Sequence, residues 1–85
     1  MIELKLVKYI PEELEENILY VSMEFGTAVH LCGCGCKTEV HTPIGVRWWT
    51  FHKDGDLFSL TPSIGNYQIP CKSHYFITNN HFVMC

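Results

Sequence analysis

The sequence predicts a mostly β protein, namely a small antiparallel β domain with one short helical turn and a zinc site. Two turn signals, Asp54-Gly55 and Asn79-Asn80, each lie between runs rich in β-branched and aromatic residues, as in tight hairpins. Five cysteines among 85 residues, three of them at alternate positions, indicate a metal site. A chain this short forms a single domain, 1–85, whose small core benefits from a metal cross-link.

The elements follow in order along the chain. Ile2, Leu4 and Leu6 alternate with charged residues, which predicts a half-exposed first strand. Pro11, followed by an acidic segment to residue 16, predicts a short helix or turn, since proline suits a first helical position and acids favour the first turn. The segment 61–66, Thr-Pro-Ser-Ile-Gly-Asn, is predicted to be a turn-rich loop. The remaining predicted strands are 18–23, 27–31, 39–42, 47–53, 57–60, 75–78 and 81–84.

Two consecutive tryptophans pose a packing question. Trp48 and Trp49 would point to opposite sides of their strand, because alternate residues of a strand face opposite ways. A thin sandwich with two covered faces would bury both rings. Otherwise one ring stays exposed and can contact a partner, and both alternatives are open.

Charge and hydropathy exclude two classes of partner. The net charge is −3 and the sequence pI is about 5.9, and the six basic residues are scattered, so nucleic acid is not expected to bind. No apolar stretch reaches the length of a membrane span. No signal peptide is visible at the N-terminus, and five cysteines cannot all pair, so a reducing cytoplasm is predicted.

Cysteine and histidine residues form two ligand-like strings. The first is His-x-Cys-x-Cys-x-Cys over 30–36 and the second is Cys-x-x-His over 71–74. Soft thiolates with an imidazole favour Zn²⁺ over magnesium or calcium. Six candidates compete for four positions, and the predicted ligand set takes one close pair from each string. That set is Cys34, Cys36, Cys71 and His74.

The remaining candidates have less definite roles. His30 and Cys32 are predicted to lie immediately beside the metal, and whether either replaces a member of the ligand set is open. Cys85, at the terminus, is predicted to take no part. Buried free cysteines and disulfides are the alternatives to a metal site, and the clustering argues against the first of them.

Catalytic candidates accompany the ligands. Glu24 could act as a general base on zinc-bound water, with His30 as a second proton carrier and Ser63 as a donor to an oxyanion. Ser63 could instead form a nucleophile–base pair with His74 or His30, although the Gly-x-Ser-x-Gly motif of serine hydrolases is missing. Ordinary structural roles for Glu24 and Ser63, in a strand and a turn, are equally compatible with the sequence.

The longer strings resemble a known family. The first string is Leu-Tyr-Val-Ser-Met-Glu-Phe-Gly-Thr-Ala-Val-His-Leu-Cys-x-Cys-Gly-Cys over 19–36, preceded by Tyr-Ile-Pro-Glu-x-Leu over 9–14. With Pro-Ser-Ile-Gly-Asn-Tyr over 62–67 and Pro-Cys-x-Ser-His-Tyr-Phe-Ile over 70–77, it looks like the bacterial family catalogued as domain of unknown function 6527. Tyr67 departs from the tryptophan expected there. The resemblance covers nearly the whole chain. Its motifs single out Glu24, His30, Cys32, Cys34, Cys36, Ser63, Cys71, Ser73 and His74.

The resemblance also implies a function. Members of that family tend to be encoded beside ubiquitin-like proteins and their activating and conjugating enzymes in defence-associated operons. The implied activity is a zinc-containing peptidase that processes or deconjugates a bacterial ubiquitin-like protein, with that protein or its conjugates as partners. The alternative is a non-catalytic zinc module that acts as an adaptor for the activating or conjugating enzymes.

Overall fold

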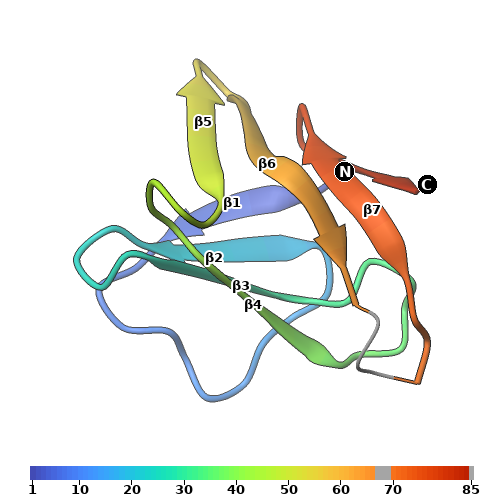
Figure 1. Cartoon of the computed structure of the whole chain (residues 1–85). Coiled ribbons are helices and arrows are strands. Elements are labelled where there is room, and N and C mark those ends of the chain that lie inside the picture. The colour runs from blue at the N-terminus through green and yellow to red at the C-terminus, as the bar shows by residue number, and fades with distance from the viewer. Residues whose placement is uncertain (67–69, 85) are drawn as a thin grey trace.

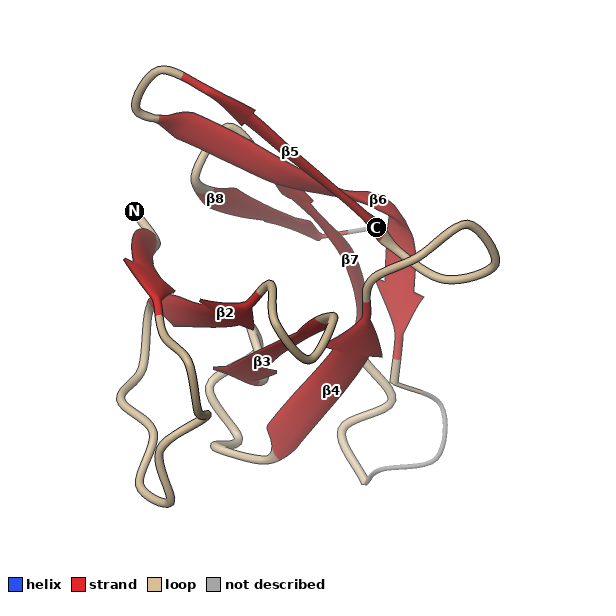
Figure 2. Ribbon diagram, turned by 90° about the vertical axis from the view of Figure 1, so that its left-hand side faces the viewer, coloured by secondary structure: helices blue, strands red, loops and turns tan. Residues whose placement is uncertain are grey.

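The chain folds into two four-stranded sheets. The computed structural model describes residues 1–66 and 70–84, and within them it contains strands and no helix. The first sheet has the order β1-β2-β3-β4 and the second the order β5-β6-β7-β8 (Figures 1 and 2). The predicted mostly β, largely antiparallel fold is confirmed. The strands are β1 Glu3–Leu6, β2 Ile18–Ser22, β3 Thr27–Leu31, β4 Glu39–Pro43, β5 Thr50–Asp54, β6 Leu57–Gly65, β7 His74–Thr78 and β8 His81–Met84.

The first sheet contains one parallel pair. β1 runs parallel to β2, so residues 7–17 must cross back along the sheet before β2 begins. The sequence predicted a short helix or turn here, and the crossover contains bends and a turn, so the expected helical turn does not form. A helical nucleus is unfavourable in so short a segment, and the Glu15 N–H donates instead to the Tyr20 hydroxyl at 3.0 Å. Asn17, with φ of 61°, then reverses the chain into β2.

Both predicted hairpins lie in the second sheet. The β5–β6 ladder closes at the pair Asp54↔Leu57, so its two-residue turn starts at Gly55, one position later than predicted. Gly55 has a φ of 61°, which glycine adopts without strain. The β7–β8 hairpin turns at Asn79-Asn80, as predicted, with φ values of 45° and 67°. β5 itself begins at Thr50, three residues after the predicted start.

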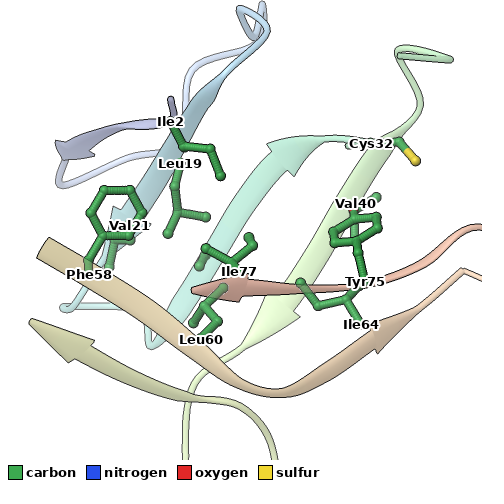
Figure 3. Close-up of a cluster of buried hydrophobic side chains, with 11 residues drawn as sticks. Ile2, Leu19, Val21, Cys32, Val40, Phe58, Leu60, Ile64, Tyr75 and Ile77 are labelled. Atoms are coloured by element: carbon green, nitrogen blue, oxygen red, sulfur yellow. The ribbon is translucent and has the colours of Figure 1, made fainter. Parts of the chain in front are cut away.

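β6 is longer than the sequence suggested. The segment 61–66, predicted to be a turn-rich loop, continues the strand as far as Gly65, so that prediction is wrong. The register with β7 shifts between Leu60 and Ile64, and the strand bends there (Figure 3). Proline is tolerated in a strand at such an irregularity, which explains how Pro62 is accommodated. The extension places Ser63 on a strand rather than in a loop.

The core lies between the two sheets, as in a β-sandwich. Side chains from β2 and from β6 and β7 point toward one another across this space (Figure 3). Cys32 lies at one end of the core, just after β3. The buried core residues are Ile2, Leu19, Val21, Ala28, Cys32, Val40, Phe58, Leu60, Ile64, Tyr75 and Ile77.

The N-terminus is tied to the second sheet. Asn80 is buried, and its Oδ1 accepts a hydrogen bond from the Phe58 N–H at 2.7 Å. Its carbonyl oxygen accepts from the Ile2 N–H at 2.6 Å. One turn residue therefore joins β6, the β7–β8 hairpin and the start of the first sheet.

Of the two alternatives for the tryptophans, the structure shows the one in which a single ring is exposed. Trp49 packs against the core, whereas Trp48 is 60% exposed. Among the described residues, no helix is long and apolar enough to cross a membrane.

Candidate functional site

Two loops at one end of the sandwich bring four cysteines together. The β3–β4 loop is closed by a 2.8 Å hydrogen bond from the Cys32 N–H to the Thr38 carbonyl oxygen. The β6–β7 loop is closed similarly, since the Asn66 N–H donates to the Ser73 carbonyl oxygen at 2.8 Å. The first loop carries three cysteines and the second carries Cys71, and the two loops approach each other at these residues.

The four sulfur atoms form a compact cluster. All four Sγ atoms, of Cys32, Cys34, Cys36 and Cys71, lie within 4.8 Å of one another. Cys32 is 3.4 Å from Cys34 and 3.6 Å from Cys71, and Cys36 is 3.6 Å from Cys71. A tetrahedral ion with metal–sulfur bonds of about 2.3 Å would hold its sulfurs about 3.8 Å apart. The donor set and its spacing therefore fit a metal ion.

Neighbouring hydroxyl groups favour thiolates at two corners. The Thr38 hydroxyl lies 3.3 Å from Cys36 Sγ and is the main cause that lowers the pKa of Cys36 to about 6. The Ser73 hydroxyl, 3.4 Å from Cys71 Sγ, likewise lowers the pKa of Cys71. Thiolate is the form that binds metal, so the two hydroxyl contacts favour the metal-binding form at Cys36 and Cys71.

Ser63 and His74 form a second pair beside the cluster. Ser63 Oγ lies 2.7 Å from His74 Nε2. In the β6–β7 ladder Ile64 pairs with Tyr75, and both point into the core. Because neighbouring residues of a strand face opposite ways, Ser63 and His74 lie on the outer face of the second sheet, where both are half-buried. The predicted alternative of a Ser63–His74 pair thus has a geometric basis.

This pair accounts for a difference from the predicted ligand set. The fourth corner of the cysteine cluster is Cys32, whose place in the ligand set the sequence left open, and His74 lies outside the cluster, against Ser63. Cys34, Cys36 and Cys71 occupy corners as predicted.

Ser73 connects the cluster to the pair. Its hydroxyl oxygen lies 3.1 Å from Cys32 Sγ, and it accepts a hydrogen bond from Asn66 Nδ2 at 3.0 Å. Ser73 directly precedes His74, the first residue of β7. The contacts that Ser73 makes beside the cysteine cluster therefore also fix the position of His74 at the start of β7.

His30 belongs to a buried network rather than to the exposed face. Its Nε2 lies 2.7 Å from the Tyr75 hydroxyl, and its side chain is 1% exposed. Burial, and secondarily the nearby His41, lowers the pKa of His30 to about 4, so the ring is neutral at neutral pH. Its predicted role in proton transfer stays a prediction, because the ring has neither solvent access nor a contact with Ser63.

Tyr75 is the centre of this network. Its hydroxyl oxygen contacts His30 and also accepts from the Gly33 N–H and from Asn66 Nδ2, each at 3.3 Å. Burial raises the pKa of Tyr75 to about 12. The ring also packs edge-on against Phe82, with centroids 5.2 Å apart. One hydroxyl thus links β3, the β3–β4 loop and the start of the β6–β7 loop.

We expect the variant Tyr75→Phe to lower the free energy of unfolding by about 2 kcal/mol or more, because it leaves several buried polar groups without their partner. Tyr20→Phe is the matched control. Tyr20 is equally buried, but within 1–66 and 70–84 its hydroxyl accepts only from the Glu15 N–H, which lies near solvent, and the expected loss is below about 1 kcal/mol. Urea unfolding at constant metal content measures both. Equal losses for the two variants would contradict this role of Tyr75.

Glu24 lies away from both groups. It is exposed in the turn that joins β2 to β3, whereas the cysteines follow the other end of β3. A five-residue strand separates the two ends by roughly 15 Å or more. Its role as a general base stays a prediction without geometric support. Tyr67 and Cys85, also singled out in the sequence, lie outside the described residues.

Sequence reasoning undervalued three residues. Cys32 was the first cysteine of its string, and its alternation with the next two was a signal for equal treatment as a ligand. Asn66 and Tyr75 gave no comparable signal, because their importance depends on contacts made across the sandwich.

Comparison with known proteins identifies a family for the chain. No curated protein and no solved structure matches the chain. A family model described as bacterial ubiquitination-like system serine protease (BubE) matches residues 6–85. That description supports the predicted association with a bacterial ubiquitin-like system, whereas the domain-of-unknown-function name stays a prediction. Because the match spans nearly the whole sequence, the chain belongs to the bacterial ubiquitination-like system serine protease (BubE) family.

Proposed function

We propose that this chain is a serine protease that hydrolyses the bond following the C-terminus of a bacterial ubiquitin-like protein. The observation that carries the proposal is the 2.7 Å separation of Ser63 Oγ and His74 Nε2. This distance is within the reach of about 2.6–3.2 Å over which a base takes a proton from its nucleophile. The family description supports the class of enzyme and the system in which it acts.

The two residues divide the chemistry between them. Ser63 Oγ attacks the carbonyl carbon of the scissile bond while its proton passes to His74 Nε2. His74 then donates that proton to the leaving amine as the carbon–nitrogen bond breaks. Water, deprotonated by the same histidine, hydrolyses the acyl-enzyme and restores the serine. Both side chains lie on an outer face, which a protein substrate can approach.

In this proposal Zn²⁺ has a structural role. Cys32, Cys34, Cys36 and Cys71 would hold it, and four thiolates leave no position for a catalytic water. Thiolate ligands favour zinc among the common divalent ions of proteins. An ion held there would cross-link the β3–β4 and β6–β7 loops. Because Cys71 precedes His74 by three residues, that cross-link would also position the catalytic base.

The adaptor function remains the competing proposal. The observation that favours it is Trp48, whose ring is 60% exposed on the surface. An adaptor would bind the ubiquitin-like protein or its conjugating enzymes through such a ring without turnover. The two proposals therefore differ in whether a bond is broken.

The test uses a ubiquitin-like protein encoded in the same operon, fused at its C-terminus to a reporter domain. We expect release of the reporter, detected by electrophoresis and by intact mass. We also expect a fluorophosphonate probe, which reacts with activated serines, to modify Ser63 in a stoichiometric and mappable manner. Tight binding of the fusion with neither cleavage nor labelling would overturn the protease proposal and support the adaptor.

A further inference from the structure

A surface cavity is lined in part by the residue that directly precedes the serine of the proposed pair. It has a volume of about 190 Å³ and is lined by Arg47, Trp48, Trp49 and Pro62. Pro62 directly precedes Ser63 on β6. Consecutive Cα atoms are about 3.8 Å apart, so one wall of the cavity is a chain neighbour of the nucleophile. The other three residues come from the loop between β4 and β5.

The cavity arises from the way the β5–β6 ladder ends. The last pair is Thr50↔Thr61, and Pro62 has no N–H with which to extend the ladder. The backbone that precedes β5 turns toward β4 instead, since the Trp49 N–H donates to the Pro43 carbonyl oxygen at 3.0 Å. The β4–β5 loop and β6 therefore diverge at this point, and the cavity lies between them beside Pro62.

The walls of the cavity define what it can accept. Trp48, Trp49 and Pro62 contribute two indole rings and a proline ring, which offer an apolar surface. Small-molecule sites usually measure about 300–1,000 Å³, so this volume suits one side chain rather than a separate ligand. Arg47 is the single arginine of the chain, and among the described residues it forms no ion pair. An exposed guanidinium at the rim is complementary to a carboxylate.

We propose, on the basis of the proposed protease activity, that this cavity is a specificity subsite for an extended peptide segment of the substrate. An apolar side chain close to the scissile bond fills the space between Trp48 and Pro62. An acidic side chain next to it pairs with Arg47. The subsite thus selects substrates that carry an apolar and an acidic residue side by side near the cleaved bond.

The first experiment measures binding without catalysis. The Ser63→Ala protein is titrated with the peptide acetyl-Ala-Ala-Leu-Glu-Ala-Ala-amide while tryptophan emission is recorded. We expect a saturable change in emission, and about tenfold weaker binding when the leucine is replaced by alanine. Adding Trp48→Ala should weaken binding by a similar factor, whereas adding Leu57→Ala should not. Leu57 is also an exposed apolar residue, 47% exposed, but it lies at the opposite end of β6.

The second experiment separates this subsite from the protease proposal. Trp48→Ala and Arg47→Ala should each lower kcat/KM for the ubiquitin-like fusion by about tenfold. Both should be labelled by a small fluorophosphonate at the wild-type rate, because that probe does not fill the cavity. Wild-type protein that is never labelled would refute the protease proposal, while the peptide titration still tests the cavity. Unchanged peptide binding in Trp48→Ala, with melting temperature preserved, would refute the subsite.

Discussion

Replacing Ser63 with alanine is expected to lower kcat for cleavage of the ubiquitin-like fusion by about 10³-fold or more, as when a serine nucleophile is removed from other hydrolases. His74→Gln should cause a comparable loss, because the serine then has no base at 2.7 Å. Two residues that act as one unit have non-additive effects. We therefore expect the double variant to be no slower than the worse of the two single variants. Initial rates at saturating substrate measure all three.

The second sheet provides matched controls for both substitutions. Ser59 lies on the same strand, β6, but its Oγ accepts from the Asn79 N–H, so Ser59→Ala should retain activity. His52 lies beside the hydroxyl of Thr61 at 3.4 Å, and His52→Gln should also retain it. If Ser63→Ala cleaves at the wild-type rate, Ser63 is not the nucleophile. A multiplicative loss in the double variant would mean that the two residues act independently.

Loss of the metal is expected to have the largest effect on stability. Cys71→Ala should abolish stoichiometric zinc binding and lower the free energy of unfolding by about 4 kcal/mol, because zinc that binds only the folded protein stabilises it by its binding free energy. A small domain has little stability in reserve. Much of the variant should therefore be unfolded at 37 °C, and its activity should fall accordingly. Elemental analysis and thermal melting monitored by circular dichroism measure the two effects.

Two further variants distinguish the structural ligand set from the set with histidine. Cys32→Ala should lose zinc, whereas His74→Ala should keep one equivalent of zinc and a near-native melting temperature while losing activity. The opposite pattern, with zinc lost in His74→Ala and retained in Cys32→Ala, would restore the ligand set first predicted from the sequence. Cys85→Ala serves as the cysteine control and is expected to retain zinc.

Local signals were sufficient for most of the strands. The turn at Asn79-Asn80 and the alternation around it depend on backbone preferences that neighbouring residues alone express. The same local signals failed at 61–66, where proline, glycine and asparagine indicated a loop. There, pairing of Ile64 with Tyr75 and burial of both side chains outweighed the turn preferences. Sequence reasoning consequently missed that Ser63 is held on a strand.

The kinds of side chain that form the site could be predicted, but not which of them contact one another. Ligand type and spacing pointed to a metal held by both halves of the chain, and the four-cysteine cluster agrees with that. Which of six candidates would meet could not be predicted, because His74 is as close in sequence to Cys71 as any ligand pair requires. The side chain of Tyr75 points into the core, so the side chain of its neighbour His74 points outward, where it contacts Ser63 and not the cysteines.

The sequence by itself determined the β class, the two hairpins and a thiol-rich cluster able to bind a metal, because turn chemistry, alternation and ligand spacing are properties of neighbouring residues. Only the tertiary structure decided that Cys32 completes the cluster and that Ser63 meets His74. Both contacts join segments that are remote in sequence or separated by a register shift. They depend on how β6 pairs with β7 and on how the two sheets enclose their common core, and no local pattern encodes either.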